Sequence, residues 1–245
     1  MRWLSPSAAR AYAQLQGAFG PRPFSNGDAR EVLRSSETWT NLLLSRLAAR
    51  GWAFSLGRGV HVLHDPLAAL SRMERDWGER LVGHRSLPPL QVAVGWLLRT
   101  YGARLRGLAL FGSVARGEEG AQSDVDLLGV VEGLQGPPSE RPDELRSLHA
   151  DLGPLLARQW SALRECHPPS VILLSPSEVD APRYLWLDLA EDAIVILDRD
   201  RLLSRRFEQV RHRLRDLHAR RLRDATGARY WEVPRGSVFA EVLAS

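Results

Sequence analysis

The chain has 245 residues, 44% of them hydrophobic and 25% charged, and a formal net charge of +4, as is typical of a globular protein of one or two domains. Its single cysteine, Cys166, excludes an internal disulfide and a cysteine-based zinc site, and because its 33 basic side chains are all arginine it has no catalytic lysine. No apolar run reaches the roughly 18 residues of a membrane span and the N-terminus lacks a signal-peptide pattern, so we expect a cytoplasmic protein with no membrane partner.

The first 65 residues are predicted to form three helices followed by a hairpin. A serine suited to cap a helix precedes each helical pattern, which places helices at residues 5–16, 25–33 and 37–50. Short apolar runs then flank a Gly57-Arg58-Gly59 turn and indicate a hairpin over residues 52–63. The first domain is therefore expected to span residues 1–65.

This order of elements resembles a winged helix-turn-helix. The resemblance implies that the third helix enters the major groove of DNA and that the hairpin touches the phosphate backbone. The candidate DNA-binding residues on this basis are Thr38, Thr40, Asn41 and Arg46 on the third helix and Arg58 at the hairpin tip. The third helix carries few basic residues, so a winged helix that mediates homodimerisation or docks a partner stays open as an alternative.

A connecting helix is predicted for residues 66–87, because apolar side chains recur there at helical spacing with arginines between them. Pro88 and Pro89 then mark a domain boundary. A helix over residues 90–101 opens the second domain, which we expect to span residues 88–198.

The residues that indicate a function lie between positions 108 and 130. An apolar strand pattern, Leu108-Ala109-Leu110-Phe111, runs directly into Gly112-Ser113, and a second apolar strand follows Asp126. Side chains two residues apart on a strand point to the same face, so Asp124 and Asp126 are expected to project together toward the Gly-Ser turn. Two adjacent carboxylates repel each other, and a divalent cation such as Mg²⁺ removes that cost and also bridges to substrate phosphates.

The pattern Gly112-Ser113, Arg116-Gly117 and Ser123-Asp124-Val125-Asp126-Leu127 resembles the signature of the minimal nucleotidyltransferases in the DNA polymerase β superfamily. The resemblance implies an α+β protein in which a mixed sheet with helices follows the N-terminal domain. It implies nucleotide binding by Gly112, Ser113 and Arg116, catalysis by Ser113, Asp124 and Asp126, and coordination of Mg²⁺ or Mn²⁺ by the two aspartates. Arg116 either neutralises the leaving pyrophosphate or pairs with a nearby acid.

The reaction that this resemblance implies is transfer of a nucleoside monophosphate from a nucleoside triphosphate to a protein, an RNA or a small molecule. Relatives of this type are often partners in toxin–antitoxin modules. The superfamily usually has a third carboxylate on the next strand, whereas this chain has Ser170 there, with Glu165 before that strand and Glu178 after it. This departure keeps an alternative open: a DNA-binding transcriptional regulator or antitoxin whose transferase domain is weakly active or inactive.

The C-terminal region, residues 199–245, is predicted to contain a strongly basic helix and a tail. Apolar residues recur at spacings of four and three from Leu203 to Leu217, and arginines fill the other faces of a helix that we expect to end near Arg223. Three roles stay open for this helix: a packed helix with a solvated basic face, an arginine patch for nucleic acid, and a dimer contact. The tail from Arg229 to Pro234 is expected to add an edge strand.

Overall fold

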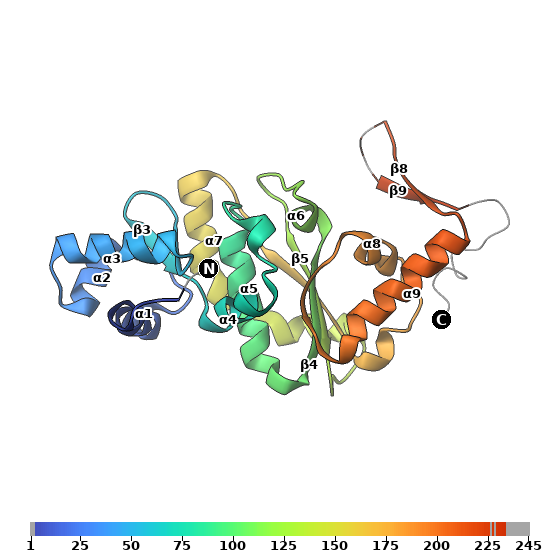
Figure 1. The fold of residues 1–245 in the computed structure, drawn as a ribbon, viewed down its shortest axis with the longest axis horizontal. Coiled ribbons are helices and arrows are strands. Elements are labelled where there is room, and N and C mark those ends of the chain that lie inside the picture. The colour runs from blue at the N-terminus through green and yellow to red at the C-terminus, as the bar shows by residue number, and fades with distance from the viewer. Residues whose placement is uncertain (1–2, 226, 228, 234–245) are drawn as a thin grey trace.

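The N-terminal part of the chain folds around three short helices and a small sheet (Figure 1). The computed structural model describes residues 3–225, 227 and 229–233. The elements of this part are α1 (Pro6–Phe19), β1 (Phe24–Ser25), α2 (Asn26–Leu33), α3 (Glu37–Ala49), β2 (Ala53–Ser55) and β3 (Val60–Leu63). The three expected helices and the expected hairpin are confirmed. The strand β1 was not predicted, and it pairs with β3 to give the order β1-β3-β2.

Serine caps explain where these helices begin. The hydroxyl groups of Ser5, Ser25 and Ser36 accept hydrogen bonds from the backbone N–H three residues further on, at 3.4, 3.1 and 3.3 Å. At α2 the carboxylate of Asp28 also accepts from the Ser25 N–H at 2.7 Å, which completes a capping box. Local sequence signals thus define the helix starts.

The connection to the second part of the chain contains two helical segments rather than the single helix expected for residues 66–87. Helix α4 (Pro66–Arg75) ends where Asp76 adopts a left-handed backbone conformation with φ of 49°, and a short 3₁₀ helix, η1 (Glu79–Leu81), follows. Asp65 caps α4 by accepting from the Leu67 N–H at 2.9 Å, and its carboxylate also binds Arg99 of α5 (Leu87–Tyr101) at 2.5 Å. Asp65 therefore ties the two helices together.

A four-stranded mixed sheet forms the centre of the second part (Figure 1). Its strands are β4 (Leu105–Phe111), β5 (Val125–Val131), β6 (Pro169–Leu174) and β7 (Ile194–Asp198), in the order β6-β5-β4-β7. The strands β5 and β6 run parallel, whereas β4 is antiparallel to both β5 and β7. The position of residues 194–197 at a sheet edge is as predicted.

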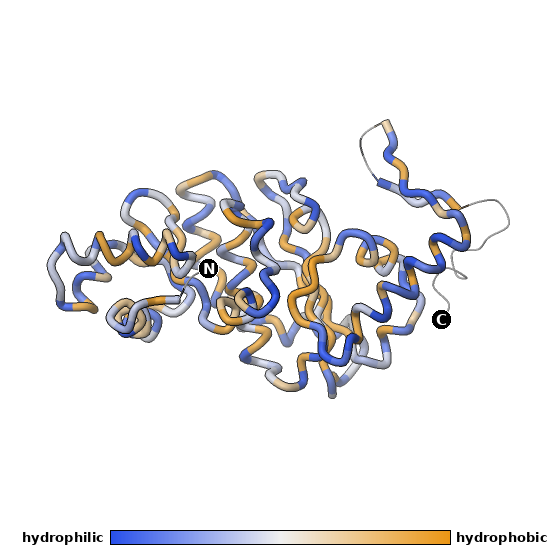
Figure 2. The backbone as a smooth tube through the Cα atoms, in the orientation of Figure 1, coloured by the Kyte–Doolittle hydropathy of each residue, from blue (hydrophilic) through white to orange (hydrophobic). Residues whose placement is uncertain are grey.

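Helices cover both faces of this sheet. The helices α5 and α7 (Arg146–Leu163) pack against one face through Leu108, Leu110 and Leu127. The helices α8 (Leu185–Asp192) and α9 (Leu202–Asp216) pack against the other through Ala109 and Leu128. Figure 2 shows hydrophobic residues concentrated in these strands and hydrophilic residues along the outside of α9. The remaining short helices are η2 (Gly102–Arg104), α6 (Gly112–Arg116), η3 (Pro138–Leu145), η4 (Pro176–Glu178) and η5 (Arg199–Arg201).

The C-terminal region differs from the prediction, because α9 ends at Asp216 instead of continuing to Arg223. His218 adopts a left-handed conformation with φ of 49°, and the Ala219 N–H bonds back to the Leu214 carbonyl at 2.9 Å, which closes the helix. The chain then forms a hairpin of β8 (Arg220–Arg223) and β9 (Arg229–Glu232). The expected tail strand exists, but it pairs with β8 and not with the central sheet. Residues 234–245 of the expected tail lie outside the described residues.

No described helix combines the length and the hydropathy that a membrane span requires.

Candidate functional site

The tight turn between β4 and α6 brings Gly112 against Asp126. Phe111 at the end of β4 pairs with Asp126 across the antiparallel ladder, so the next residue lies beside the aspartate side chain. Gly112 has a φ of 75°, and a Cβ atom at this position would lie 2.1 Å from Oδ2 of Asp126. Only glycine therefore permits both this backbone conformation and this position of the carboxylate.

The two aspartates lie at the start of β5. Asp124 is exposed one residue before the strand, and Asp126 is half-buried within it. Burial raises the pKa of the Asp126 carboxyl, and the negative charge of Asp124 raises it further, while the Arg116 guanidinium lowers it. The negative charges of the two carboxylates repel each other, and a bound cation would offset this repulsion.

The donor set suits a cation that is shared with a substrate. Among the residues that the structure describes, no group of three or more His, Cys, Asp or Glu side chains is arranged to hold a metal ion. At this site the protein offers the carboxylates of Asp124 and Asp126, to which phosphate and water oxygens can be added as ligands. Mg²⁺ is commonly bound in this way, through one or two carboxylates and substrate phosphates. The residues present therefore fit the expected Mg²⁺ or Mn²⁺ ion.

The short helix α6 carries the other two predicted site residues. Ser113 is its second residue and is partly buried, and its carbonyl accepts from the Glu118 N–H at 2.9 Å. Arg116, its last residue, donates from Nε to Glu118 at 2.8 Å and lies 3.5 Å from the carboxylate of Asp192. Of the two roles open for Arg116, the structure shows pairing with nearby acids.

Ser170, opposite Asp126, occupies the place where a third carboxylate was expected. The parallel ladder of β5 and β6 pairs these two residues directly. Glu165 is engaged elsewhere, because its carboxylate binds Arg85 at 2.7 Å. Glu178 follows the far end of β6 and binds Arg141 at 2.6 Å, which holds the pKa of its carboxyl at about 2. Neither glutamate takes the place opposite Asp126.

The candidate DNA-binding residues of the N-terminal part are exposed, with one exception. Thr38, Asn41, Arg46 and Arg58 have exposed side chains. Thr40 is only 1% exposed, and its hydroxyl donates to the Ser36 carbonyl at 3.0 Å. The assignment of Thr40 to a DNA-contacting surface was therefore wrong: its hydroxyl satisfies the backbone of its own helix and faces inward.

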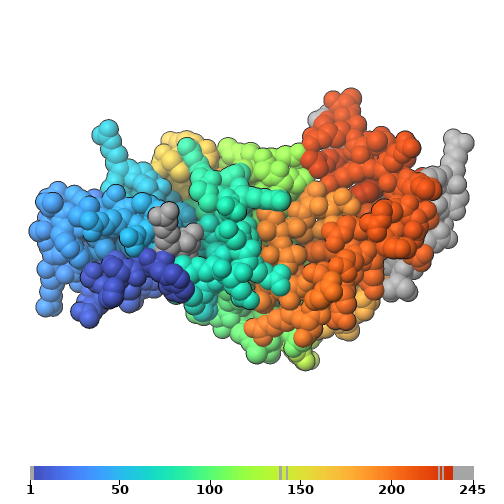
Figure 3. Space-filling view, viewed as in Figure 1, coloured from blue at the N-terminus to red at the C-terminus, as the bar shows by residue number. Residues whose placement is uncertain are grey.

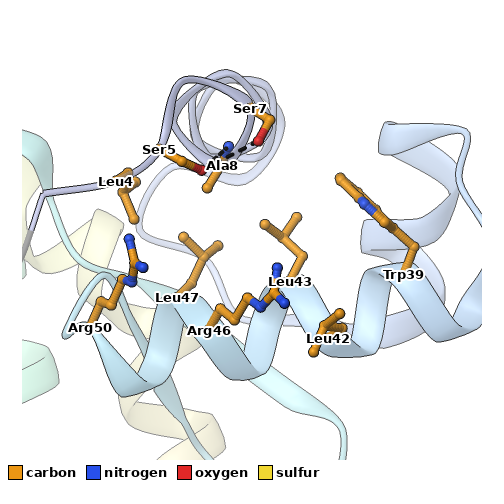
Figure 4. A pocket seen from close by; sticks show the side chains of 10 residues that line it. All are labelled: Leu4, Ser5, Ser7, Ala8, Trp39, Leu42, Leu43, Arg46, Leu47 and Arg50. Carbon is orange, nitrogen blue, oxygen red and sulfur yellow. Dashed lines mark hydrogen bonds between the residues drawn. The ribbon is translucent and has the colours of Figure 1, made fainter.

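A pocket of about 120 Å³ lies beside α3, between this helix and the start of α1 (Figure 4). It is lined by Leu4, Ser5, Ser7, Ala8, Trp39, Leu42, Leu43, Arg46, Leu47 and Arg50. Trp39 and Leu42 are large apolar side chains, yet they are 42% and 47% exposed. The exposed face of α3 therefore combines Arg46 with two large apolar side chains, and only the polar part was predicted.

Residues 98–161 match the family model described as a nucleotidyltransferase domain. The matched segment contains β4, α6, β5 and most of α7, and hence Gly112, Ser113, Arg116 and both aspartates. The mixed sheet with helices on both faces is consistent with a nucleotidyltransferase fold. No curated protein matches the chain.

Solved structures with similarity to the chain include a toxin–antitoxin complex with AMP-PNP, at 16% identity and a TM-score of 0.34, covering 51% of this chain and 90% of that one. A mutant of the toxin–antitoxin MntA-HpeT is similar at 15% identity and a TM-score of 0.34, with coverage of 51% and 89%. The mRNA-binding domain of elongation factor SelB from E. coli, in complex with SECIS RNA, is similar at 17% identity and a TM-score of 0.23, with coverage of 42% and 92%.

Proposed function

We propose that this chain is a Mg²⁺-dependent nucleotidyltransferase that moves a nucleoside monophosphate from a nucleoside triphosphate to a protein, RNA or small-molecule acceptor. The observation that supports the proposal best is the close packing of Gly112 against Asp126, with Asp124 two residues earlier in the chain, inside the segment that matches the nucleotidyltransferase model. We also propose that the protein acts in a toxin–antitoxin module, together with a protein partner.

Each site residue has a distinct part in this proposal. Asp124 and Asp126 would hold the ion, which when bound would offset the repulsion between their charges and the charge on the phosphates. Gly112 leaves room for the Asp126 carboxylate, and Ser113 offers a hydroxyl to the triphosphate. The acceptor oxygen bonds to the α-phosphorus as the bond to the bridging oxygen breaks, and that electron pair leaves with pyrophosphate. The acceptor proton is lost to solvent in the overall reaction, and Ser170, opposite Asp126, offers no carboxylate to take it up.

The test is isothermal titration of each nucleoside triphosphate into the wild type and into an Asp124→Asn/Asp126→Asn variant, with and without Mg²⁺. We expect Mg²⁺-dependent binding by the wild type and a loss of more than about 100-fold in the variant, since changing a group that merely orients a metal ligand costs roughly 10- to 100-fold. Transfer of labelled nucleotide would then identify the acceptor.

An Asp143→Asn/Asp151→Asn variant is the matched control, because it makes the same charge change at two exposed positions away from the site. It should bind nucleotide as the wild type does. A folded wild type that binds no nucleoside triphosphate would contradict the enzyme proposal and favour the DNA-binding regulator.

We also propose that residues 1–65 form a winged helix that binds DNA, with the third helix in the major groove. The exposed polar side chains of Thr38, Asn41 and Arg46 on α3, together with Arg58 beyond β2, support this second function. The pairing of β1 with β3 beside the hairpin supports it as well.

Gel shifts across a range of salt concentrations test this second function. We expect Arg46→Ala/Arg58→Ala to weaken DNA binding and to lower the salt slope by about 1 for each phosphate contact removed. Arg10→Ala, on the exposed face of α1, is the control and should have little effect. If the wild type gives no gel shift at low salt, DNA binding is contradicted. Homodimerisation or docking of a partner then remains as the role of residues 1–65, and sedimentation would reveal either.

A further inference from the structure

The C-terminal hairpin presents one strongly cationic face. Its register pairs Arg221 with Trp231 and Arg223 with Arg229. Because side chains alternate along a strand, these four residues share one face of the hairpin. The opposite face carries Arg220, Leu222, Tyr230 and Glu232. The three arginines of the first face, together with Arg116 of α6, are called the arginine cluster below.

The first anchor of this cluster is Glu118, two residues after α6. Its carboxylate accepts from Arg116 at 2.8 Å and from Arg223 at 2.5 Å, and it also bonds Arg229. The hydrogen bond from Arg116 contributes most to holding the pKa of Glu118 at about 2, followed by that from Arg223, so this carboxylate is charged at neutral pH. The hairpin is thus joined to the end of α6, which begins at Gly112.

The second anchor is Asp192, the last residue of α8. Arg221 lies 2.7 Å from its carboxylate, Arg116 lies 3.5 Å away and Arg229 lies 3.8 Å away. Figure 3 shows the hairpin, in red, in contact with the green segment around α6 and the orange segment of α8. Residues about a hundred positions apart in the sequence therefore meet beside the predicted nucleotide site.

Positive charge exceeds negative charge at this place. Four guanidinium groups share the carboxylates of Glu118 and Asp192, and Arg221 also donates to Asp188 at 3.0 Å. Among the described residues in direct ion-pair contact here, Asp188 included, four guanidinium groups face three carboxylates; the carboxylates of Asp124 and Asp126 are not among these contacts. The Nε atoms of Arg221 and Arg229 are buried and have no hydrogen-bond partner. The cluster therefore retains unpaired guanidinium donors, which an additional anion would reach by taking the place of a carboxylate oxygen.

The position of the cluster identifies that anion. Arg116 is the last residue of the short helix α6, and Gly112, the first residue of this helix, lies against Asp126, so the cluster lies beside the proposed metal and nucleotide site. Guanidinium groups bind phosphate oxygens through paired N–H donors, and a polyphosphate carries several such oxygens. A triphosphate would take the place of carboxylate oxygens as the partner of Arg116 and of the hairpin arginines.

We propose that the β8–β9 hairpin is part of the nucleotide site and that Arg221 and Arg229, with Arg116, bind the β- and γ-phosphates of the substrate and then the pyrophosphate product. This inference rests on the proposed transferase function and extends its site beyond residues 98–161, the segment that matches the family model.

The experiment compares isothermal titrations of ATP, AMP and pyrophosphate, all with Mg²⁺, into the full chain and its variants. In Arg221→Gln/Arg229→Gln we expect ATP and pyrophosphate affinities to fall by more than about tenfold, since hydrogen bonds to charged groups are the stronger ones, while AMP affinity stays unchanged. Arg220→Gln, on the opposite face of the same strand, is the control and should bind all three as the wild type does. Arg229→Lys should retain part of the pyrophosphate affinity because it keeps the charge.

The outcomes separate the inference from the function on which it rests. A double variant that binds ATP as tightly as the wild type overturns the inference and leaves the transferase proposal standing. Equal losses for ATP and AMP also overturn it, because they would indicate a merely structural role for the hairpin. If the wild type binds none of the three ligands, the transferase proposal is contradicted, and the inference that rests on it is contradicted as well. Unchanged ATP binding with weakened binding of an RNA oligonucleotide would assign the hairpin to nucleic acid instead.

Discussion

Substitution of Gly112 by alanine is expected to abolish nucleotidyl transfer while the chain stays folded. The added Cβ atom would lie 2.1 Å from Oδ2 and 3.0 Å from Cγ of Asp126, so the carboxylate would have to rotate away from the turn. A displacement of about 1 Å in a reacting geometry can reduce a rate by roughly 100-fold, and here the displaced group is a proposed metal ligand. We therefore expect transfer to fall by at least about 100-fold, and Mg²⁺-dependent nucleotide binding to weaken with it.

Gly133→Ala is the matched control for this experiment. Gly133 has a φ of 74°, against 75° for Gly112, but no heavy atom lies within 4 Å of its added Cβ atom. Both variants therefore place an alanine at a φ near 75°, which costs roughly 1–2 kcal/mol in the free energy of unfolding, and only Gly112→Ala displaces a carboxylate. Denaturant unfolding should report a loss of stability for both variants, larger for Gly112→Ala because the Asp126 carboxylate is also displaced, and transfer assays should report a loss only for Gly112→Ala. Wild-type transfer by Gly112→Ala would show that the position of Asp126 is not critical.

The centre of the candidate site was predictable because it is local in sequence. Gly112 directly follows β4, and Asp124 and Asp126 lie at the start of β5, the antiparallel neighbour of β4, so strand periodicity and a tight turn suffice to bring Gly112 and Asp126 together. The helix starts at Ser5, Ser25 and Ser36 were predictable for the same reason, since each cap acts over three residues. Local sequence patterns do not predict a side-chain contact when the two residues come from elements far apart in the chain.

The hairpin contacts illustrate that failure. The turn that ends α9 is at His218, which is neither glycine nor proline, so the apolar periodicity gave no sign of a helix end before Arg223. The arginines after it look alike in sequence, and only the folded chain separates Arg221, which binds Asp192, from Arg220, which faces the other way. A similar limit applies to Thr40: its position on α3 was predicted, but its burial depends on how the helices pack.

The largest stability effect is expected for Gly95→Ala, at the contact between α4 and α5. An added Cβ atom on Gly95 would lie 2.0 Å from Cγ of Asp65, whose side chain is 8% exposed. The carboxylate would have to leave its place as the cap of α4 and as the partner of Arg99. Overpacking of a core costs roughly 1–3 kcal/mol and loss of a helix cap about 1 kcal/mol. We therefore expect the free energy of unfolding to fall by about 3 kcal/mol in denaturant titrations.

Gly17→Ala provides a control of opposite sign. Gly17 lies in α1, is exposed, and has no heavy atom within 4 Å of an added Cβ atom. Alanine there should raise stability by roughly 0.5–1 kcal/mol through its higher helix propensity. The two substitutions are chemically identical. If the free energy of unfolding falls in Gly95→Ala but rises in Gly17→Ala, the difference is due to the contact with Asp65. Equal or greater stability of Gly95→Ala relative to the wild type would contradict the predicted clash.

A double-mutant cycle with Asp65→Ala identifies the atoms responsible. If the Gly95→Ala cost arises from displacement of the Asp65 carboxylate, the double variant has no carboxylate to displace, and its loss of stability should be smaller than the sum of the two single losses. Additive losses would place the cost elsewhere in α5. The cycle also tests how the two parts of the chain are joined, because Asp65 lies two residues after β3 and binds Arg99 of the helix that leads into the central sheet.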